Sequence, residues 1–269
     1  MTGTIFVETL RRSWRQMIYW GLGFAIYAIY PFLMVPNEAS LETLKDITDG
    51  FNPEFLAAFG IDSTSFSSVA GLVGYSFFGY LLLMISIFSV IAGLNISANE
   101  EDNGIMDMVL SLPVKRWQVI VEKLFAYIVM LIGILAIAFM GLMFGSSLSQ
   151  IEVDITTTRF LEGIVNVIPG AVLVMCFTAF IGVLVRQRSL ATAIAGSFVV
   201  ISYLVDGIGR AANNDTADTI RQISIFAHYN GTKILETGLA WGTVIMLSVI
   251  AGVLAVGTIE LFKRRDIAV

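Results

Sequence analysis

The chain has few charged residues, one cysteine and one histidine among its 269 residues. Asp, Glu, Lys and Arg make up 14% of it, whereas soluble domains contain about 25%. Because so few charges cannot cover a water-soluble core of this size, a soluble enzyme is excluded. A single cysteine, Cys176, excludes a disulfide framework. The formal net charge of −5 provides no basic face, so no nucleic-acid partner is expected.

Motifs for nucleotide and metal chemistry are missing as well. The sequence has no Gly-x-x-x-x-Gly-Lys-Ser/Thr phosphate loop and no His-Glu-x-x-His pair. We therefore expect no catalytic site, no metal site and no cofactor in this chain. If ATP drives its activity, another polypeptide binds the nucleotide.

Hydrophobic residues account for 57% of the chain and fall into long runs. A membrane-spanning helix needs about 20 consecutive apolar residues, and six segments are long enough. These predict an all-α, polytopic membrane protein with a single transmembrane domain over 1–269. The predicted spans are 17–35, 72–95, 119–144, 164–185, 190–208 and 239–262.

Lysine and arginine set the expected orientation, because cytoplasmic loops carry an excess of both. With both termini cytoplasmic, the inner segments contain eleven of these residues and the outer segments five. We therefore predict cytoplasmic termini and a first external loop over 36–70. In that loop, Ser40 is expected to cap one short helix and Pro53 to open another. The scattered acids of the loop are predicted to form a solvated face.

Residues 4–15 precede the first span and combine apolar residues at helical spacing with Arg11, Arg12 and Arg15. One interpretation is an amphipathic helix on the inner membrane surface, whose arginines meet anionic headgroups. The other is a simple positively charged anchor for the first span. Periodicity alone does not separate them.

The loop over 98–117 contains the densest acidic cluster, Glu100 to Asp102, followed by an apolar stripe. Ile105, Met108 and Leu112 recur at helical spacing, and Pro113 ends the pattern. The sequence thus predicts a short amphipathic helix on the cytoplasmic side between two spans. Such a helix either receives a partner or lies passively among the headgroups.

At this loop the chain resembles the permease subunits of type-2 ABC exporters. These typically have an acidic stretch, a glycine, a hydrophobic helix ending in Leu-x-x-Pro, a basic residue, and a lysine in the next span. Gly104, Leu110, Pro113, Arg116 and Lys123 follow that order here. The segment 223–230 is similar to the Ser-Pro-Phe-His-Tyr region of the family without its proline, and 262–267 is similar to its basic ending.

The resemblance implies a dimerising permease, paired with a second copy or a paralogue, in a bacterial plasma membrane. Separate cytoplasmic ATPase subunits would bind ATP and Mg²⁺, and the exit path would lie between the two permeases. The loop would act as a coupling helix that docks on the ATPase. The residues expected at that contact are Glu100, Glu101, Gly104, Ile105, Met108, Leu110, Leu112, Pro113 and Arg116.

Two other functions compete with ATP-driven export. A channel or secondary transporter would place ionisable groups near the middle of its spans, whereas charges such as Asp206 and Glu122 fall near predicted span ends. An intramembrane hydrolase would need His228, which is predicted to lie outside. Nearly uncharged span centres therefore favour export of an apolar or amphipathic solute. Gly141 and Gly145 permit close helix approach, either within one chain or between two.

Overall fold

The computed structural model describes residues 3–62, 65–97, 115–151, 153, 155–185, 187–212 and 214–264. Within these ranges all regular structure is helical, and six helices are long and apolar enough to cross a membrane. The predicted fold class and the number of spans are confirmed. The spanning helices are α1 (Thr4–Met34), α4 to α5 (Val69–Ser97), α8 (Arg116–Leu148), α9 (Thr157–Val185), α10 (Arg188–Ala212) and α14 (Trp241–Lys263).

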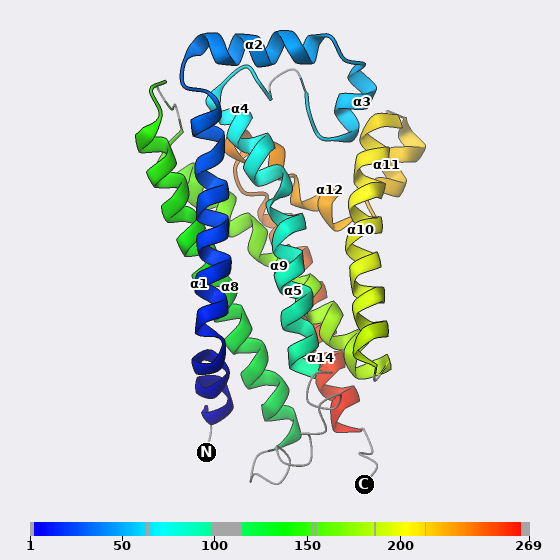
Figure 1. Ribbon diagram of the computed structural model, residues 1–269. Helices are drawn as coiled ribbons and strands as arrows, with labels where there is room; N and C mark the ends of the chain where they lie inside the picture. Colours follow the sequence, from blue (N-terminus) through cyan, green and yellow to red (C-terminus); the bar gives the residue numbers. More distant parts are fainter. Residues whose placement is uncertain are drawn as a thin grey trace.

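The bundle has two distinct ends (Figure 1). At one end α1 begins, α5 ends, α8 begins and α14 ends; at the other, α2 (Glu38–Asp49) runs across the top. We call these the terminal end and the α2 end. The predicted N-terminal helix is present, and it runs without a break into the first span as α1.

Two helix pairs form the body of the bundle. α1 packs mainly on α8, and α5 packs mainly on α9, which also contacts α14 and α10. α9 is the most buried span and α14 the least. The central position of α9 explains why apolar residues occupy all of its faces, as expected for a helix surrounded by other apolar surfaces.

Glycines bring both pairs into backbone contact. A Cβ atom placed on Gly93 of α5 would lie 2.5 Å from the Met175 carbonyl oxygen of α9. One placed on Gly141 of α8 would lie 2.6 Å from the Cα of Ala25 in α1, and one placed on Gly145 would lie 3.1 Å from the Cα of Ile29 and 2.6 Å from the Phe32 ring. The close approach predicted from Gly141 and Gly145 therefore occurs within one chain.

The second span contains a local change of helix type. α4 (Val69–Val73) passes into a π-helix, η1 (Gly74–Phe78), before α5 (Gly79–Ser97) resumes. The Tyr27 hydroxyl on α1 donates a hydrogen bond to the Ser76 carbonyl in this turn. π-turns are rare and often found at functional sites, and this one lies where α1 meets the second span.

The external loop forms the two predicted short helices, α2 and α3 (Pro53–Ala58). Pro53 occupies the first turn of α3, as expected. The predicted cap of α2 is wrong, because the helix begins at Glu38 and the Asn37 side chain accepts a hydrogen bond from the Ser40 amide at 3.0 Å. The acids on both helices are exposed, which confirms the solvated face.

A second segment at the α2 end enters the bundle before the last span. It comprises α11 (Asp215–Arg221), α12 (Ile225–Tyr229), η2 (Gly231–Lys233) and α13 (Ile234–Thr237). α12 packs between α9 and α10, with Ile225, Phe226 and Tyr229 buried. The Asn166 side chain of α9 donates to the Tyr229 carbonyl at 2.7 Å, which holds this segment inside the bundle.

Candidate functional site

The predicted ATPase contact falls mostly outside the described residues. This is so for Glu100, Glu101, Gly104, Ile105, Met108, Leu110, Leu112 and Pro113, while Arg116 is the first residue of α8. The two helices that bracket the loop, α5 and α8, end and begin at the terminal end of the bundle, beside the start of α1 (Figure 1). The loop is therefore attached to the bundle through the end of α5 and the start of α8.

Glu122 connects α8 to the first turn of α1. Its carboxylate oxygens accept hydrogen bonds from the backbone amides of Gly3 at 2.8 Å, Ile5 at 3.0 Å and Phe6 at 3.2 Å. The first amides of a helix have no partner within the helix and carry partial positive charge, so a carboxylate there is stabilising. Glu122 thus takes the place of a local N-cap on α1, whose own N-cap residue, Gly3, makes no side-chain bond.

The next residue of α8, Lys123, connects it to α5. Its side chain is buried, with 6% exposed, and its ammonium group donates to the Asn95 carbonyl at 3.1 Å. Asn95 lies two residues before the end of α5. Adjacent residues of α8 therefore hold both α1 and α5 close to the loop that joins α5 to α8.

An apolar groove of about 450 Å³ separates α1 from α5. Trp20 stacks on Phe24 at a centroid distance of 6.1 Å and meets Phe88 edge-on at 6.2 Å. Among the described residues, no charged side chain lines the groove. Its lining residues are Tyr19, Trp20, Gly23, Phe24, Tyr27, Met84 and Ile87.

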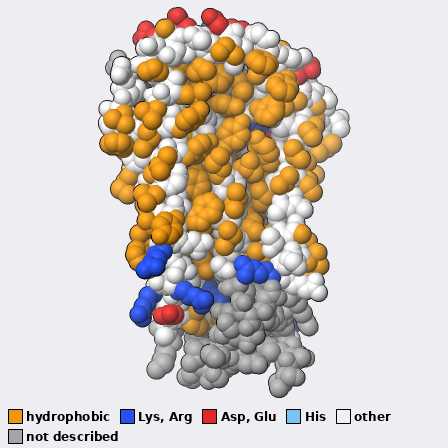
Figure 2. All heavy atoms as spheres, in the orientation of Figure 1, with side chains coloured by type: hydrophobic (Ala, Val, Ile, Leu, Met, Phe, Trp, Pro, Cys, Tyr) orange, Lys and Arg blue, Asp and Glu red, His pale blue; other side chains and the backbone are white. Residues whose placement is uncertain are grey.

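The groove opens on a broad hydrophobic face. Figure 2 shows apolar side chains over nearly the whole length of the face on which α1, α5 and α10 lie, with most acidic residues near α2 and most basic residues toward the terminal end. Tyr19, Ile26 and Ile87 are largely exposed there. A surface of this size and composition fits lipid or another apolar protein surface rather than water.

A buried ion cluster lies at the α2 end of α10. Asp206, 3% exposed, accepts hydrogen bonds from Arg210 one turn later and from Arg221 of α11 at 2.7 Å. Arg221 is in turn 3.9 Å from the exposed Asp218. The two guanidinium groups offset the cost of burying the negative charge of Asp206. The ion pair with Arg221 also holds α11 against α10.

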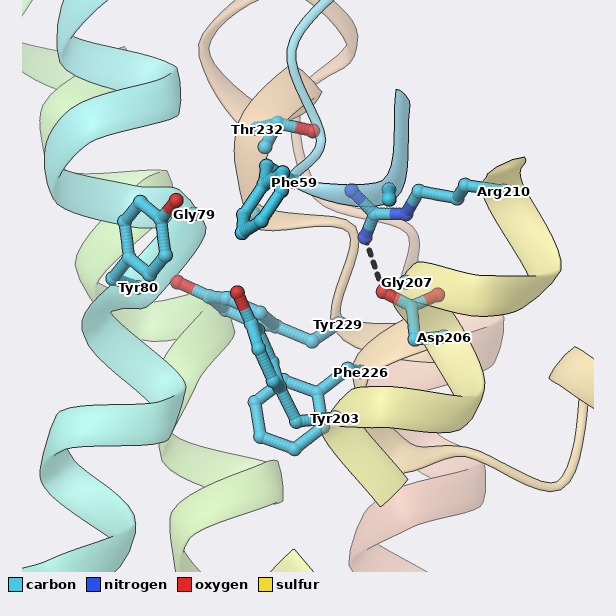
Figure 3. Close-up of a pocket in the computed structure, with 12 residues that line it drawn as sticks. Phe59, Gly79, Tyr80, Tyr203, Asp206, Gly207, Arg210, Phe226, Tyr229 and Thr232 are labelled. Atoms are coloured by element: carbon cyan, nitrogen blue, oxygen red, sulfur yellow. Dashed lines mark hydrogen bonds and ion pairs between the residues drawn. The ribbon is translucent and has the colours of Figure 1, made fainter. Parts of the chain in front are cut away.

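Aromatic residues border this cluster (Figure 3). Phe59, Tyr203 and Tyr229 lie between α5 and α10, with the Asp206–Arg210 pair on the α10 side. The enclosed cavity measures about 20 Å³, room for about one water molecule. The Tyr229 hydroxyl donates to the Phe78 carbonyl of the π-helix at 2.7 Å. Burial raises the pKa of Tyr229 well above its ordinary value, so the hydroxyl keeps the proton that it donates.

The remaining candidates for catalysis or metal binding do not form a site in the described residues. His228 lies in α12, and its Nε2 atom is 2.8 Å from the Gln222 carbonyl. Among the described residues, no three His, Cys, Asp or Glu side chains are grouped so that they could hold a metal ion.

The site predicted from the sequence, the loop 98–117, lies mostly outside the described residues, and the sequence did not predict the groove, the π-helix or the ion cluster. Asp206 and Arg210 stand four residues apart on one helix, a spacing that favours an ion pair and was a usable signal. Trp20, Phe24 and Tyr27 also share one helical face, but nothing in the sequence says which helix that face meets.

Six apolar helices with ionic groups kept near their ends define a helical-bundle membrane protein. The comparison with protein families gives the particular class. A family model described as multidrug efflux system permease Rv1217c, C-terminal domain, matches residues 9–263, and the chain belongs to this family. The membership agrees with the resemblance to exporter permeases drawn from 98–117. No curated protein matches the chain.

Proposed function

We propose that this permease is the membrane-spanning subunit of an ATP-driven ABC exporter. It has cytoplasmic termini in a bacterial plasma membrane and moves apolar or amphipathic solutes outward. The observation that carries the proposal is the uncharged, aromatic groove between α1 and α5 in a chain of an efflux permease family. The basic residues toward the terminal end (Figure 2) support a cytoplasmic location for that end.

The groove is the proposed half-site for the solute. Trp20, Phe24 and Met84 offer flat and polarisable surfaces that bind aromatic or aliphatic groups without requiring one shape. Because the groove opens on an exposed apolar face, a second permease, a copy or a paralogue, would cover it. The covered grooves of two chains would then form the exit path at the dimer interface.

ATP is bound and hydrolysed, with Mg²⁺, on separate ATPase subunits that contact the loop 98–117. Movement of that loop would be transmitted to α8, which follows it. From α8 it would pass to α1 through the Glu122 contact and to α5 through the Lys123 contact. The permease itself needs no catalytic group or cofactor. Closure of the ATPases would shift α1 and α8 against α5 and α9 and so open the groove alternately to the two sides.

The competing function is an ATP-independent channel or secondary transporter. It would need an ionisable group that changes its charge along the solute path. Asp206 is the buried carboxylate nearest to such a role, but it is paired with two arginines at the α2 end. This pairing favours a structural role for Asp206 and export driven from outside the chain.

Affinity purification from the native membrane tests the proposal. We expect an ATPase with a phosphate loop to co-purify, and we expect efflux of an amphipathic dye from cells to require both chains. Efflux by the permease alone in proteoliposomes, driven by an ion gradient, would establish the secondary transporter instead.

The coupling loop has its own test. Gly104→Pro and Met108→Asp should uncouple ATP hydrolysis from transport while the permease still inserts into the membrane. Wild-type transport and ATPase binding in both variants would show that the loop is not the docking element.

A further inference from the structure

Toward the α2 end, the apolar groove adjoins a group of tyrosines on the second span and α10. The Tyr75 and Tyr80 hydroxyls lie 3.0 Å apart. Tyr203 points from α10 toward α5 (Figure 3), and its hydroxyl is a further partner of Tyr80. Tyr27, which lines the groove, donates its hydroxyl hydrogen to the carbonyl of Ser76, the neighbour of Tyr75. We call Tyr75, Tyr80 and Tyr203 the tyrosine cluster.

The π-helix η1 brings this cluster into line with the groove. Residues five positions apart lie on one side of a π-helix, whereas they are about 140° apart around an α-helix. Tyr75 and Tyr80 therefore share one side of the second span, and their rings meet edge-on with centroids 5.6 Å apart. Tyr80 in turn precedes Met84 and Ile87 of the groove by four and seven residues, so these three share one stripe of α5. The π-helix thus adds a polar end to an apolar path.

The tyrosine cluster has a hydroxyl donor to spare. Its three O–H groups share two contacts, Tyr75 with Tyr80 and Tyr80 with Tyr203, so at least one O–H has no acceptor among the residues that the structure describes. All three side chains are partly exposed, so a molecule in the groove can reach them. An unmatched donor in apolar surroundings costs free energy, and an oxygen atom of a ligand would remove that cost.

The nearest charges favour an oxygen atom over a cation. Arg210 and Asp206 line the small cavity that Tyr80 and Tyr203 also line. Asp206 is shared between Arg210 and a second arginine, Arg221, so the charge beside the cluster is on balance positive. A positive charge repels a cationic ligand and attracts the electron-rich oxygen of a carbonyl group.

We propose that the tyrosine cluster binds a carbonyl or other uncharged acceptor oxygen of the exported solute, while the groove holds the apolar body of the molecule. The proposal rests on the proposed function, because the solute is the one that the groove carries. It narrows the substrate class to neutral amphipathic molecules with an acceptor oxygen at one end.

Equilibrium binding to the full chain in detergent tests the proposal with two matched probes. Benzophenone has a carbonyl group between its phenyl rings, and diphenylmethane has a CH₂ group there. We expect benzophenone to bind about tenfold more tightly than diphenylmethane, the size of one hydrogen bond. The triple variant Tyr75→Phe, Tyr80→Phe, Tyr203→Phe should lose this preference. The control Tyr19→Phe removes an exposed hydroxyl from the groove lining and should keep it.

Photolabelling of the wild-type chain adds a readout that needs no variant. Under near-ultraviolet light, the benzophenone carbonyl attaches to C–H groups in contact with it, and peptide mass spectrometry locates the label. We expect label on the peptides that contain residues 75–80 and 203. Label confined to other parts of the chain would overturn the proposal.

The binding outcomes separate the tyrosine cluster from export itself. Equal affinities for the two probes, or a preference that the folded triple variant keeps, would overturn the proposal. Loss of the preference in Tyr19→Phe to the same extent as in the triple variant would also overturn it. If the preference and the label are found but vesicles show no ATP-dependent accumulation of solute, the tyrosine cluster is supported and the export function fails.

Discussion

The two sides of α5 differ in how tightly they are packed. On one side Gly93 brings α5 against the α9 backbone, so that an added Cβ would lie 2.5 Å from the Met175 oxygen. On the other side α5 faces α1 across the 450 Å³ groove lined by Trp20 and Met84. From this difference we expect α5 to move as one body with α9 and the bundle to open at the boundary with α1.

The same reasoning applies to α1. Gly141 fixes α8 against Ala25, so α1 and α8 form the second body. The two bodies are joined at both ends of the boundary, by the Tyr27 to Ser76 hydrogen bond near the π-helix and by Lys123 to Asn95 at the terminal end. Interfaces that are tight on one side and loose on the other are suited to rigid-body motion.

The largest effect is expected when the tight side of α5 is broken. Gly93→Val would force a side chain against the Met175 carbonyl oxygen and the Thr178 Cβ atom and should destabilise the chain by about 3 kcal/mol. Gly196→Val is the control, because a Cβ there meets no atom within 4 Å. Thermal unfolding in detergent measures both. Equal midpoints would mean that the α5–α9 contact is not rigid.

The ion cluster at the α2 end should have the next largest effect. Asp206→Ala leaves Arg210 and Arg221 without their shared carboxylate and should cost about 2 kcal/mol, below the full value for a buried pair because both arginines are partly solvated. Asp218→Ala removes an exposed acid near the same Arg221 and should change stability little. A cost for Asp218→Ala as large as that for Asp206→Ala would contradict the buried cluster.

Glu122→Gln should have a smaller and more local effect. Losing the negative charge from the start of α1 should cost about 1 kcal/mol. Hydrogen exchange should quicken at the amides of Ile5 and Phe6. Glu8→Gln changes an exposed acid on the same helix and serves as the control. Unchanged exchange in Glu122→Gln would show that α1 is held by other contacts.

Gly23→Leu should have the smallest effect on stability. A Cβ on Gly23 meets no atom within 4 Å, so the new side chain fills part of the groove and the free energy of unfolding should change by less than about 0.5 kcal/mol. Chemical denaturation measures it. A large destabilisation would mean that the α1–α5 boundary is already closed.

The sequence was sufficient to predict the elements whose causes are local. Run length predicted the six spans, and Pro53 and Asn52 together define the start of α3. The cap of α2 was misassigned because Asn37 and Ser40 are both good capping residues three positions apart, and only the backbone geometry selects Asn37.

Features that depend on which helices meet could not be predicted in this way. The groove, the bond from Glu122 to α1 and the contact of Tyr229 with Phe78 join residues more than about 50 positions apart. Apolar residues on every face of a span give no preferred direction for packing. Small residues such as Gly93 and Gly141 set the close contacts, and their partners become visible only in the folded chain.

ATP-dependent accumulation of an amphipathic fluorescent dye in inside-out membrane vesicles tests the central claim most directly. Gly23→Leu is compared with Gly252→Leu, which adds the same side chain at an open position on α14. We predict that Gly23→Leu abolishes accumulation while Gly252→Leu and the wild type accumulate dye equally, with all three present at equal levels. Full accumulation by Gly23→Leu would contradict a solute path through the α1–α5 groove.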